Sequence, residues 1–365
     1  MDKVYVNLLP AITWNWTKVN GKEIGELPAF SQGSISIRCD RELIIEDTAA
    51  KGSDIDARSN RAIDDALRRG ELVTGLGPDM DRLLAANGIK VKKIAVNRDC
   101  RIFVDYDMVS DSIAAVEFDV ADGVSVNVIE KFTCNEKNVK AGVQTRFVLG
   151  KGARAVLSQV QRTDRSCVFL NDTGLLQEED SSFEMREVYL CGGETYLGAR
   201  TALNGDRSSF DFDMGYIVDG DSRLDMNFAA FQNAKDTYAM INANGTLKDR
   251  AYKLFRATVD FKTGASGSHG EEREDVLMMS DDVTNLNVPL ILCSEEDVEG
   301  IHAATLGRPS EEALVYMGSR GLDREAVCEL MSVARVAAVA SKIEDEQTVQ
   351  EIEEYLHPGE DNIDR

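Results

Sequence analysis

From about Ile94, short strand-like segments follow one another for some two hundred residues, with no helical pattern between them. Many of them alternate apolar and polar residues, which is typical of strands that bury one face. In 209–218, Phe210, Phe212 and Met214 fall on one face, and Asp211 and Asp213 fall on the other. Such a long series of strands restricts the fold to a β-sandwich, a β-barrel or a β-solenoid.

Turn-forming residues separate these segments about every dozen residues, which is the spacing of short strands joined by tight turns. They are Gly192-Gly193, Asn204-Gly205, Asp219-Gly220-Asp221, the segment 233–236, and Lys248-Asp249. The segments carry no hallmark of a sandwich, and no strict hexapeptide repeat points to the left-handed helix of acyltransferases. We therefore predict a β-solenoid.

The regions that flank the solenoid have a different pattern. Residues 1–95 are mixed and partly helical, with helical spacing in 59–72 and 78–88. The solenoid core is predicted for 96–308, and a C-terminal helical domain for 309–358. That domain contains helical patterns at 310–321, at 324–343 after the capping residue Asp323, and at 344–356. The tail, 359–365, is expected to be disordered.

Charge and cysteine content restrict the partners and the compartment. The net charge is −23, from 64 acidic and 41 basic residues, so a phosphate backbone would be repelled and nucleic acid is not an expected partner. Seven cysteines without a CxxC motif indicate free thiols in a reducing compartment. The N-terminus does not resemble a signal peptide, and no apolar run approaches the roughly 20 residues of a membrane span. We expect a soluble, cytoplasmic protein with no membrane association.

Motifs of common enzyme classes are absent from the sequence. It contains no GxxxxGK[ST], no GxGxxG after a strand, no HExxH and no GxSxG. The chain is therefore not expected to bind a nucleotide, and it is not obviously an enzyme. One of its three histidines, His302, lies in "DVEGIHAATLGR", between the last strand-like segments and the first C-terminal helix.

The sequence around His302 resembles the SufB/SufD family of scaffold proteins, which build iron–sulfur clusters. Several family motifs occur in the family's order: Val276–Met279, Pro289-Leu290, Asp297-Val298, His302, Ala304-Thr305, Gly307, Val315–Met317 and Ser319–Leu322. The segment 244–261 is similar to a family segment upstream, and 10–20 is similar to a Trp-rich opening of shorter members.

This resemblance implies a mainly β protein, a right-handed parallel β-helix with helical N- and C-terminal regions. It implies a scaffold that holds a transient iron–sulfur cluster and passes it to apoprotein acceptors. It also implies a SufC-like ABC-type ATPase as the partner, docked on the C-terminal helices. Glu274 or Asp275 stands where SufB has a cysteine, and Ala303 where SufB has a glutamate. The chain is closer to a short, single-scaffold SufD-like type, which would form a homodimer through 272–307.

Four residues near this motif are candidate ligands. His302 can supply an imidazole, and Cys293 can supply the thiolate that iron–sulfur clusters prefer; alternatively, His302 bonds a backbone carbonyl and Cys293 is a small buried hydrophobe. Glu299 and Glu274 can supply carboxylates, although solvated charge is the commoner fate in so acidic a chain. His269 is expected on an exposed loop. Of the other cysteines, Cys167 is the one we consider able to carry sulfur.

The helical pattern at 324–343 is apolar almost all round, so it should be covered on two sides. One side would pack on the end of the β-helix, and the other would meet the ATPase through Val327, Leu330, Val333 and Val336. Full burial within the chain is the alternative. Two other functions compete with the scaffold: a β-helix enzyme acting on polysaccharide, which would require export, and a structural adaptor for an ABC ATPase without metal chemistry.

Overall fold

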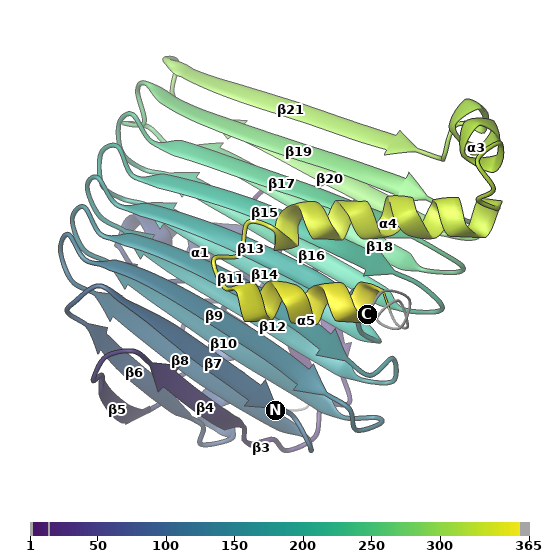
Figure 1. The fold of residues 1–365 in the computed structure, drawn as a ribbon. Coiled ribbons are helices and arrows are strands. Elements are labelled where there is room, and N and C mark those ends of the chain that lie inside the picture. The colour runs from purple at the N-terminus through teal and green to yellow at the C-terminus, as the bar shows by residue number, and fades with distance from the viewer. Residues whose placement is uncertain (1–2, 14, 358–365) are drawn as a thin grey trace.

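A computed structural model of the protein describes residues 3–13 and 15–357. Two large sheets, one of ten and one of nine strands, lie face to face (Figure 1). The ten-stranded sheet has the order β20 (Thr284–Cys293), β18 (Tyr252–Phe261), β16 (Arg223–Gln232), β14 (Glu194–Leu203), β12 (Val168–Gln177), β10 (Lys140–Leu149), β8 (Ser112–Val120), β6 (Lys90–Val96) and β5 (Ile44–Ala49), with β3 (Ser31–Gln32) beside β8. The nine-stranded sheet has the order β21 (Val298–Gly307), β19 (Ser268–Met278), β17 (Tyr238–Leu247), β15 (Ser209–Val218), β13 (Ser182–Cys191), β11 (Arg154–Thr163), β9 (Ser125–Cys134), β7 (Cys100–Asp107) and β4 (Ser34–Cys39).

From β6 to β21 the chain winds from one sheet to the other after each strand, so that two successive strands form one rung of a solenoid. From β6 to β21, neighbouring strands within each sheet are parallel, and residues of successive rungs stand in register, as Arg223 with Tyr252. At the other end, β5 and β4 add to the sheets as antiparallel strands. The predicted parallel β-helix architecture is confirmed.

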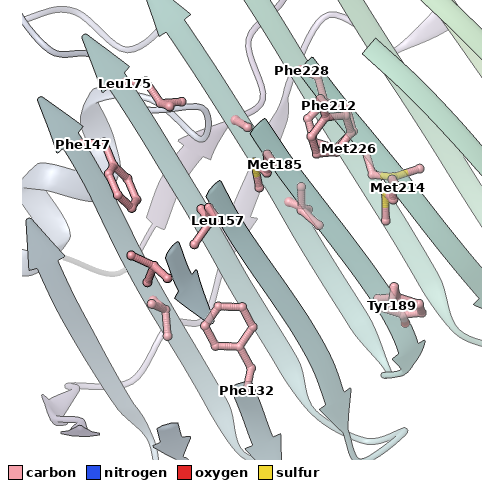
Figure 2. Packing of buried hydrophobic residues seen from close by; sticks show 14 of the residues in the cluster. Phe132, Phe147, Leu157, Leu175, Met185, Tyr189, Phe212, Met214, Met226 and Phe228 are labelled. Atoms are coloured by element: carbon pink, nitrogen blue, oxygen red, sulfur yellow. The ribbon is translucent and has the colours of Figure 1, made fainter. Parts of the chain in front are cut away.

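The inward faces of both sheets form one continuous apolar core. Phe210, Phe212 and Met214 are buried in it, as the alternation in 209–218 predicts. Aromatic rings stack from rung to rung, with centroids 4.6 Å apart for Phe118 and Phe147. Figure 2 shows part of this core, where side chains of successive rungs lie in rows along the solenoid. Each rung therefore stabilises its two neighbours by burying apolar area.

The outward residues of 209–218 are less exposed than their alternation with apolar residues predicts. Asp211 is half-buried, but Asp213 is buried, with only 5% of its surface exposed, because a C-terminal helix covers it. Its carboxylate lies 2.7 Å from Lys342 Nζ and 3.6 Å from a guanidinium nitrogen of Arg186. The outer face of this sheet is therefore a second buried surface, held partly by ion pairs.

The predicted turns are confirmed. Each of the five predicted turn sites lies between two consecutive strands from β13 to β18. Arg207, Asp236 and Asp249 in these turns have φ values of 61°, 55° and 55°, in the left-handed region that tight turns require.

The N-terminal region covers the outer face of the ten-stranded sheet. It contains the hairpin β1 (Lys3–Val6) with β2 (Lys22–Gly25), the 3-10 helix η1 (Asn15–Thr17), and the helices α1 (Asn60–Arg68) and α2 (Pro78–Ala86). Both helices lie within the predicted helical patterns, and Ser59 caps the start of α1, its side chain accepting a bond from the N–H of Ala62. Apolar residues of β1, α1 and α2 pack on outward residues of the sheet.

Three helices follow the last strand: α3 (Glu311–Gly318), α4 (Arg324–Ala340) and α5 (Glu346–Leu356). Asp323 caps α4 as predicted, accepting a bond from the N–H of Ala326. However, α4 does not pack on the end of the solenoid: α4 and α5 lie across the outer face of the nine-stranded sheet (Figure 1). No helix within the described residues is both long and apolar enough to cross a membrane. The tail predicted to be disordered, 359–365, lies outside the described residues.

Candidate functional site

The last rung, formed by β20 and β21, ends the solenoid. Its strands pair with β18 and β19 on one side, and within the described chain no strand pairs with them on the other (Figure 1). Most of β21 is exposed, including 37% of Ile301 and 51% of Leu306. A strand edge with unpaired N–H and C=O groups is a surface on which another chain can pair.

His302 lies on this rung and points towards the interior of the solenoid. It stands in register with Glu272 of β19, on the same face as the core residue Val276. Its Nδ1 lies 3.7 Å from Oε2 of Glu272. The imidazole is 36% exposed because no rung covers it, whereas the Glu272 side chain is 1% exposed. A partly open histidine therefore stands over a buried carboxyl group.

Glu272 was not among the residues singled out from the sequence. Its Oε1 accepts a bond of 2.9 Å from the N–H of Val259, whereas Oε2 is buried without a hydrogen-bond partner among the described residues. Burial raises the pKa of Glu272 to about 9. A carboxyl beside Nδ1 can fix the ring of a ligating histidine and leave Nε2 to coordinate the metal.

Cys293 is the last residue of β20, in the other sheet. It stands in register with Phe261, on the face of β18 that also carries the core residue Ala257. Its thiol is exposed and donates to the carbonyl of Glu295 over 2.9 Å. His302 is four residues beyond Val298, where β21 begins, so it lies roughly 13 Å along the strand from the turn beside Cys293. Cys293 and His302 thus share the open rung without meeting within one chain.

Glu274 is not a solvated surface charge, as the sequence favoured, because it points into the core of the solenoid. Its side chain is 1% exposed and forms an ion pair with Lys253, which is itself fully buried. Tyr216 OH lies 3.5 Å from the same carboxylate. Because Lys253 already pairs with this carboxylate, we assign Glu274 a structural role and not that of a ligand.

Glu299 faces outward, and 72% of its side chain is exposed. Its Oε2 lies 3.2 Å from Nδ1 of His269 on β19, and the His269 ring stacks on Tyr238 with centroids 5.4 Å apart. The prediction of an exposed loop at His269 is wrong: this residue is in a strand and only 28% of its side chain is exposed. The register of β19 with β21 brings these two residues together, outside the interior that holds His302.

The interior also holds polar groups that sequence analysis did not single out. Glu130 is buried between the two sheets and accepts bonds from Gln159 Nε2 at 2.7 Å and from Tyr106 OH at 3.0 Å. Burial raises its pKa to about 6. Cys167 lies 3.3 Å from Cys134, sulfur to sulfur, and both are buried. Neither feature lies on the last rung.

The residues expected to meet the ATPase divide into two groups. Val327, Val333 and Val336 are 1%, 6% and 0% exposed, so these three are not accessible to a partner in this structure. Val333 and Val336 belong to an apolar cluster with residues of β11 and β13, because α4 lies flat on the sheet. Leu330 is 46% exposed, and it stays a candidate contact.

Exposed apolar side chains gather instead on and just after α3. Val315 is 70% exposed, Tyr316 is 54% exposed, and Leu322 is 36% exposed. None of the α3 residues is buried. Large apolar residues that stay exposed side by side mark an interaction surface more often than isolated ones do.

Among residues 3–13 and 15–357, no three His, Cys, Asp or Glu side chains come close enough together to hold a metal ion. The described chain thus brings His302 and Glu272 together, and leaves Cys293 and Glu299 elsewhere on the rung.

Comparisons with known proteins agree on one family. A family model described as SUF system FeS cluster assembly, SufBD core domain, matches residues 108–334. The iron–sulfur cluster assembly protein SufD of Bacillus subtilis is 25% identical over 225 residues, which are 61% of this chain and 52% of that protein. SufD of Escherichia coli is 24% identical over 245 residues, 64% of this chain and 56% of that protein. The chain spans about half the length of these relatives.

Proposed function

Because this chain belongs to the SufBD family of iron–sulfur cluster assembly proteins, we propose that it is a scaffold subunit on which a nascent cluster is built. In this proposal the cluster is cargo, held transiently and passed to apoproteins, and the chain itself is not an enzyme. The observation that carries the proposal is the open last rung, where His302 and the buried Glu272 face the exposed end of the solenoid.

We propose that two copies pair through 272–307. The free edges of β20 and β21 offer unpaired backbone groups, and the exposed Ile301 and Leu306 would be buried by a second copy. Asn285 and Asn287 on β20 also carry side-chain oxygens that are buried without partners among the described residues. In a two-fold dimer each residue lies near its symmetry mate or a close neighbour, so ligands from both copies could complete one site.

The structure supports His302 as the leading ligand, Glu272 as the group that orients it, and Cys293 as the candidate thiolate. Iron–sulfur clusters prefer thiolates, and Cys293 is exposed at the end of β20. Glu299 is a weaker candidate because it faces outward and pairs with His269. We do not propose Glu274 as a ligand, because its carboxylate forms a buried ion pair with Lys253.

The proposed partner is a SufC-like ABC-type ATPase. The ATPase would bind the nucleotide, because this chain contains no nucleotide-binding motif. The exposed side chains of Val315, Tyr316, Leu322 and Leu330 support a docking surface on α3 and the adjoining side of α4. This surface follows β21 directly, so a pull on α3 would reach the last rung. The free thiols of the chain suit a reducing, cytoplasmic compartment.

Anaerobic reconstitution tests the scaffold directly. The full chain, with and without the ATPase, is incubated with ferrous iron and sulfide, and bound iron, bound sulfide and visible absorbance are measured. We expect stoichiometric iron and sulfide in the dimer fraction. If the chain binds the ATPase but takes up no iron or sulfide, the proposed scaffold function is wrong. The chain would then be a structural adaptor for the ATPase.

A further inference from the structure

A cavity of about 520 Å³ lies on the outer face of the ten-stranded sheet, away from the core of the solenoid. Residues 8–10 and α1 form one side of it. Arg200 of β14 and Phe231 of β16 line the sheet side, and 291–294 of the last rung line its end. This volume is in the range of small-molecule sites.

Arg200 is the unusual feature of this cavity. It is 1% exposed, and its Nε and Nη1 atoms are buried without any hydrogen-bond partner in the described chain. No carboxylate of residues 3–13 and 15–357 forms an ion pair with it. Asp172 attracts it only from a longer distance, and the centroid of the Phe231 ring lies 5.8 Å from its Cζ. Burial lowers the pKa of Arg200 to about 10. A buried guanidinium that no carboxylate contacts is costly, and a bound anion would offset that cost.

The other charges of the cavity are already balanced. Lys262 forms ion pairs with Asp64 and with Asp260, the latter at 2.7 Å. Arg61 lies 3.8 Å from Asp65. Arg200 is therefore the one cation in the described lining that no carboxylate contacts at ion-pair distance, and the cavity has room for one anionic group.

We propose that this cavity binds a small organic anion whose carboxylate or phosphate pairs with Arg200. A guanidinium bonds either group at two points, which gives both affinity and orientation. The apolar body of the ligand would pack on Phe231 and Ile63, which are both buried here. Oδ1 of Asn60, also buried without a partner, would accept a bond from a hydroxyl or amide of the ligand. The proposal does not depend on cluster assembly.

Two probes distinguish the sources of the anion: benzoate for a carboxylate and phenyl phosphate for a phosphate. Calorimetric titration of the full chain measures their affinities, and thermal unfolding is followed with each probe against sodium chloride at equal ionic strength. We expect one of them to bind and to raise the melting temperature above the chloride control. Arg200→Met should weaken that probe at least about tenfold, because the two-point pair is lost. Arg61→Met, an exposed charge at the same cavity, is the matched control and should leave affinity within about twofold.

The stability of the variants separates a ligand site from a structural arginine. Without any probe, Arg200→Met should melt at the same or a higher temperature than the wild type, because a buried charge that no carboxylate contacts is removed. Arg200→Lys keeps the charge and the fold but loses the planar fork, so it should also bind the probe weakly. The proposal is overturned if neither probe binds the wild type, if Arg200→Met binds unchanged, or if Arg200→Met unfolds while Arg200→Lys binds fully.

Discussion

His302 Nδ1 lies 3.7 Å from Oε2 of Glu272, an oxygen that is buried and has no hydrogen-bond partner in the described chain. The pair joins the two last strands of the nine-stranded sheet at the open end of the solenoid. A small shift of the ring would make a hydrogen bond, so the position of β21 and the orientation of the imidazole are linked.

His302→Ala should leave folding and ATPase binding nearly normal and lower cluster assembly by at least about tenfold, because a ligand is removed from a partly exposed site. Anaerobic reconstitution measures the loss, and growth under conditions that require iron–sulfur assembly measures it in cells. His269→Ala is the control, because that histidine lies on the neighbouring strand but on the outer face. Full rescue of growth by a stable His302→Ala protein would make the histidine structural.

Cys293→Ser should also lower iron and sulfide incorporation, because serine cannot replace a thiolate in a cluster. The cysteine is exposed, so the substitution should change the melting temperature little. Cys328→Ser on α4 provides the comparison. If both variants load iron equally well, Cys293 is not a ligand.

The dimer can be tested at its proposed edge. Ile301→Lys with Leu306→Lys places two charges on the exposed strand β21, which should give a monomer with unchanged circular dichroism. Light scattering measures the molecular mass of the wild type and of the double variant. Ile12→Lys, which changes a still more exposed isoleucine away from this edge, should stay dimeric. A wild-type protein that is strictly monomeric, with and without the ATPase, would contradict the proposal.

The ATPase surface predicts a contrast between exposed and buried positions. Val315→Asp with Tyr316→Asp should abolish co-purification of the ATPase and leave the fold intact, because both side chains are exposed. Val336→Asp should instead destabilise the protein by about 3 kcal/mol or more, since it buries an unpaired charge under α4. Undiminished ATPase binding by the double variant would place the docking surface elsewhere.

Glu130 predicts a pH dependence of stability. Its pKa is about 6 when folded and 4.5 when unfolded. The folded state therefore binds the proton more tightly, and its free energy of unfolding should fall by about 2 kcal/mol as the pH rises from below 4.5 to above 6. Glu130→Gln should lack this contribution. Urea unfolding of both proteins at the two ends of this range measures it, with Glu312→Gln on exposed α3 as the control. An identical pH dependence in wild type and Glu130→Gln would contradict the assignment.

The repeated strands could be predicted because local sequence determines them. In 209–218 the alternation of Phe210, Phe212 and Met214 with aspartates gives the strand and its inward face, and the glycines and asparagines give the turns. Which residues stand side by side depends on the register between rungs, which is set by strand and turn lengths summed over the chain. For this reason Cys293 and His302, nine residues apart in sequence, do not meet.

The missed and misplaced residues share one physical cause, which is that burial of polar groups is decided by tertiary packing. Glu272 looks like one more acid in the acidic segment 271–275, and only its inward position makes it exceptional. Glu274 is neutralised by Lys253 from the opposite sheet, a pairing that no local pattern encodes. The apolar pattern of α4 fits burial by this chain as well as by a partner, and only the structure shows that the sheet covers Val333 and Val336.

The stacking of rungs implies a gradient of opening along the axis of the solenoid. Each interior rung has neighbours on both sides, but the last rung is held by β18 and β19 alone. In a structure with only nearest-neighbour contacts, such a terminal unit frays first. The backbone amides of β20 and β21 would then exchange with deuterium sooner than those of β14 or β15, and a second copy would slow them. The strand that carries His302 is thus the one whose order a partner can control.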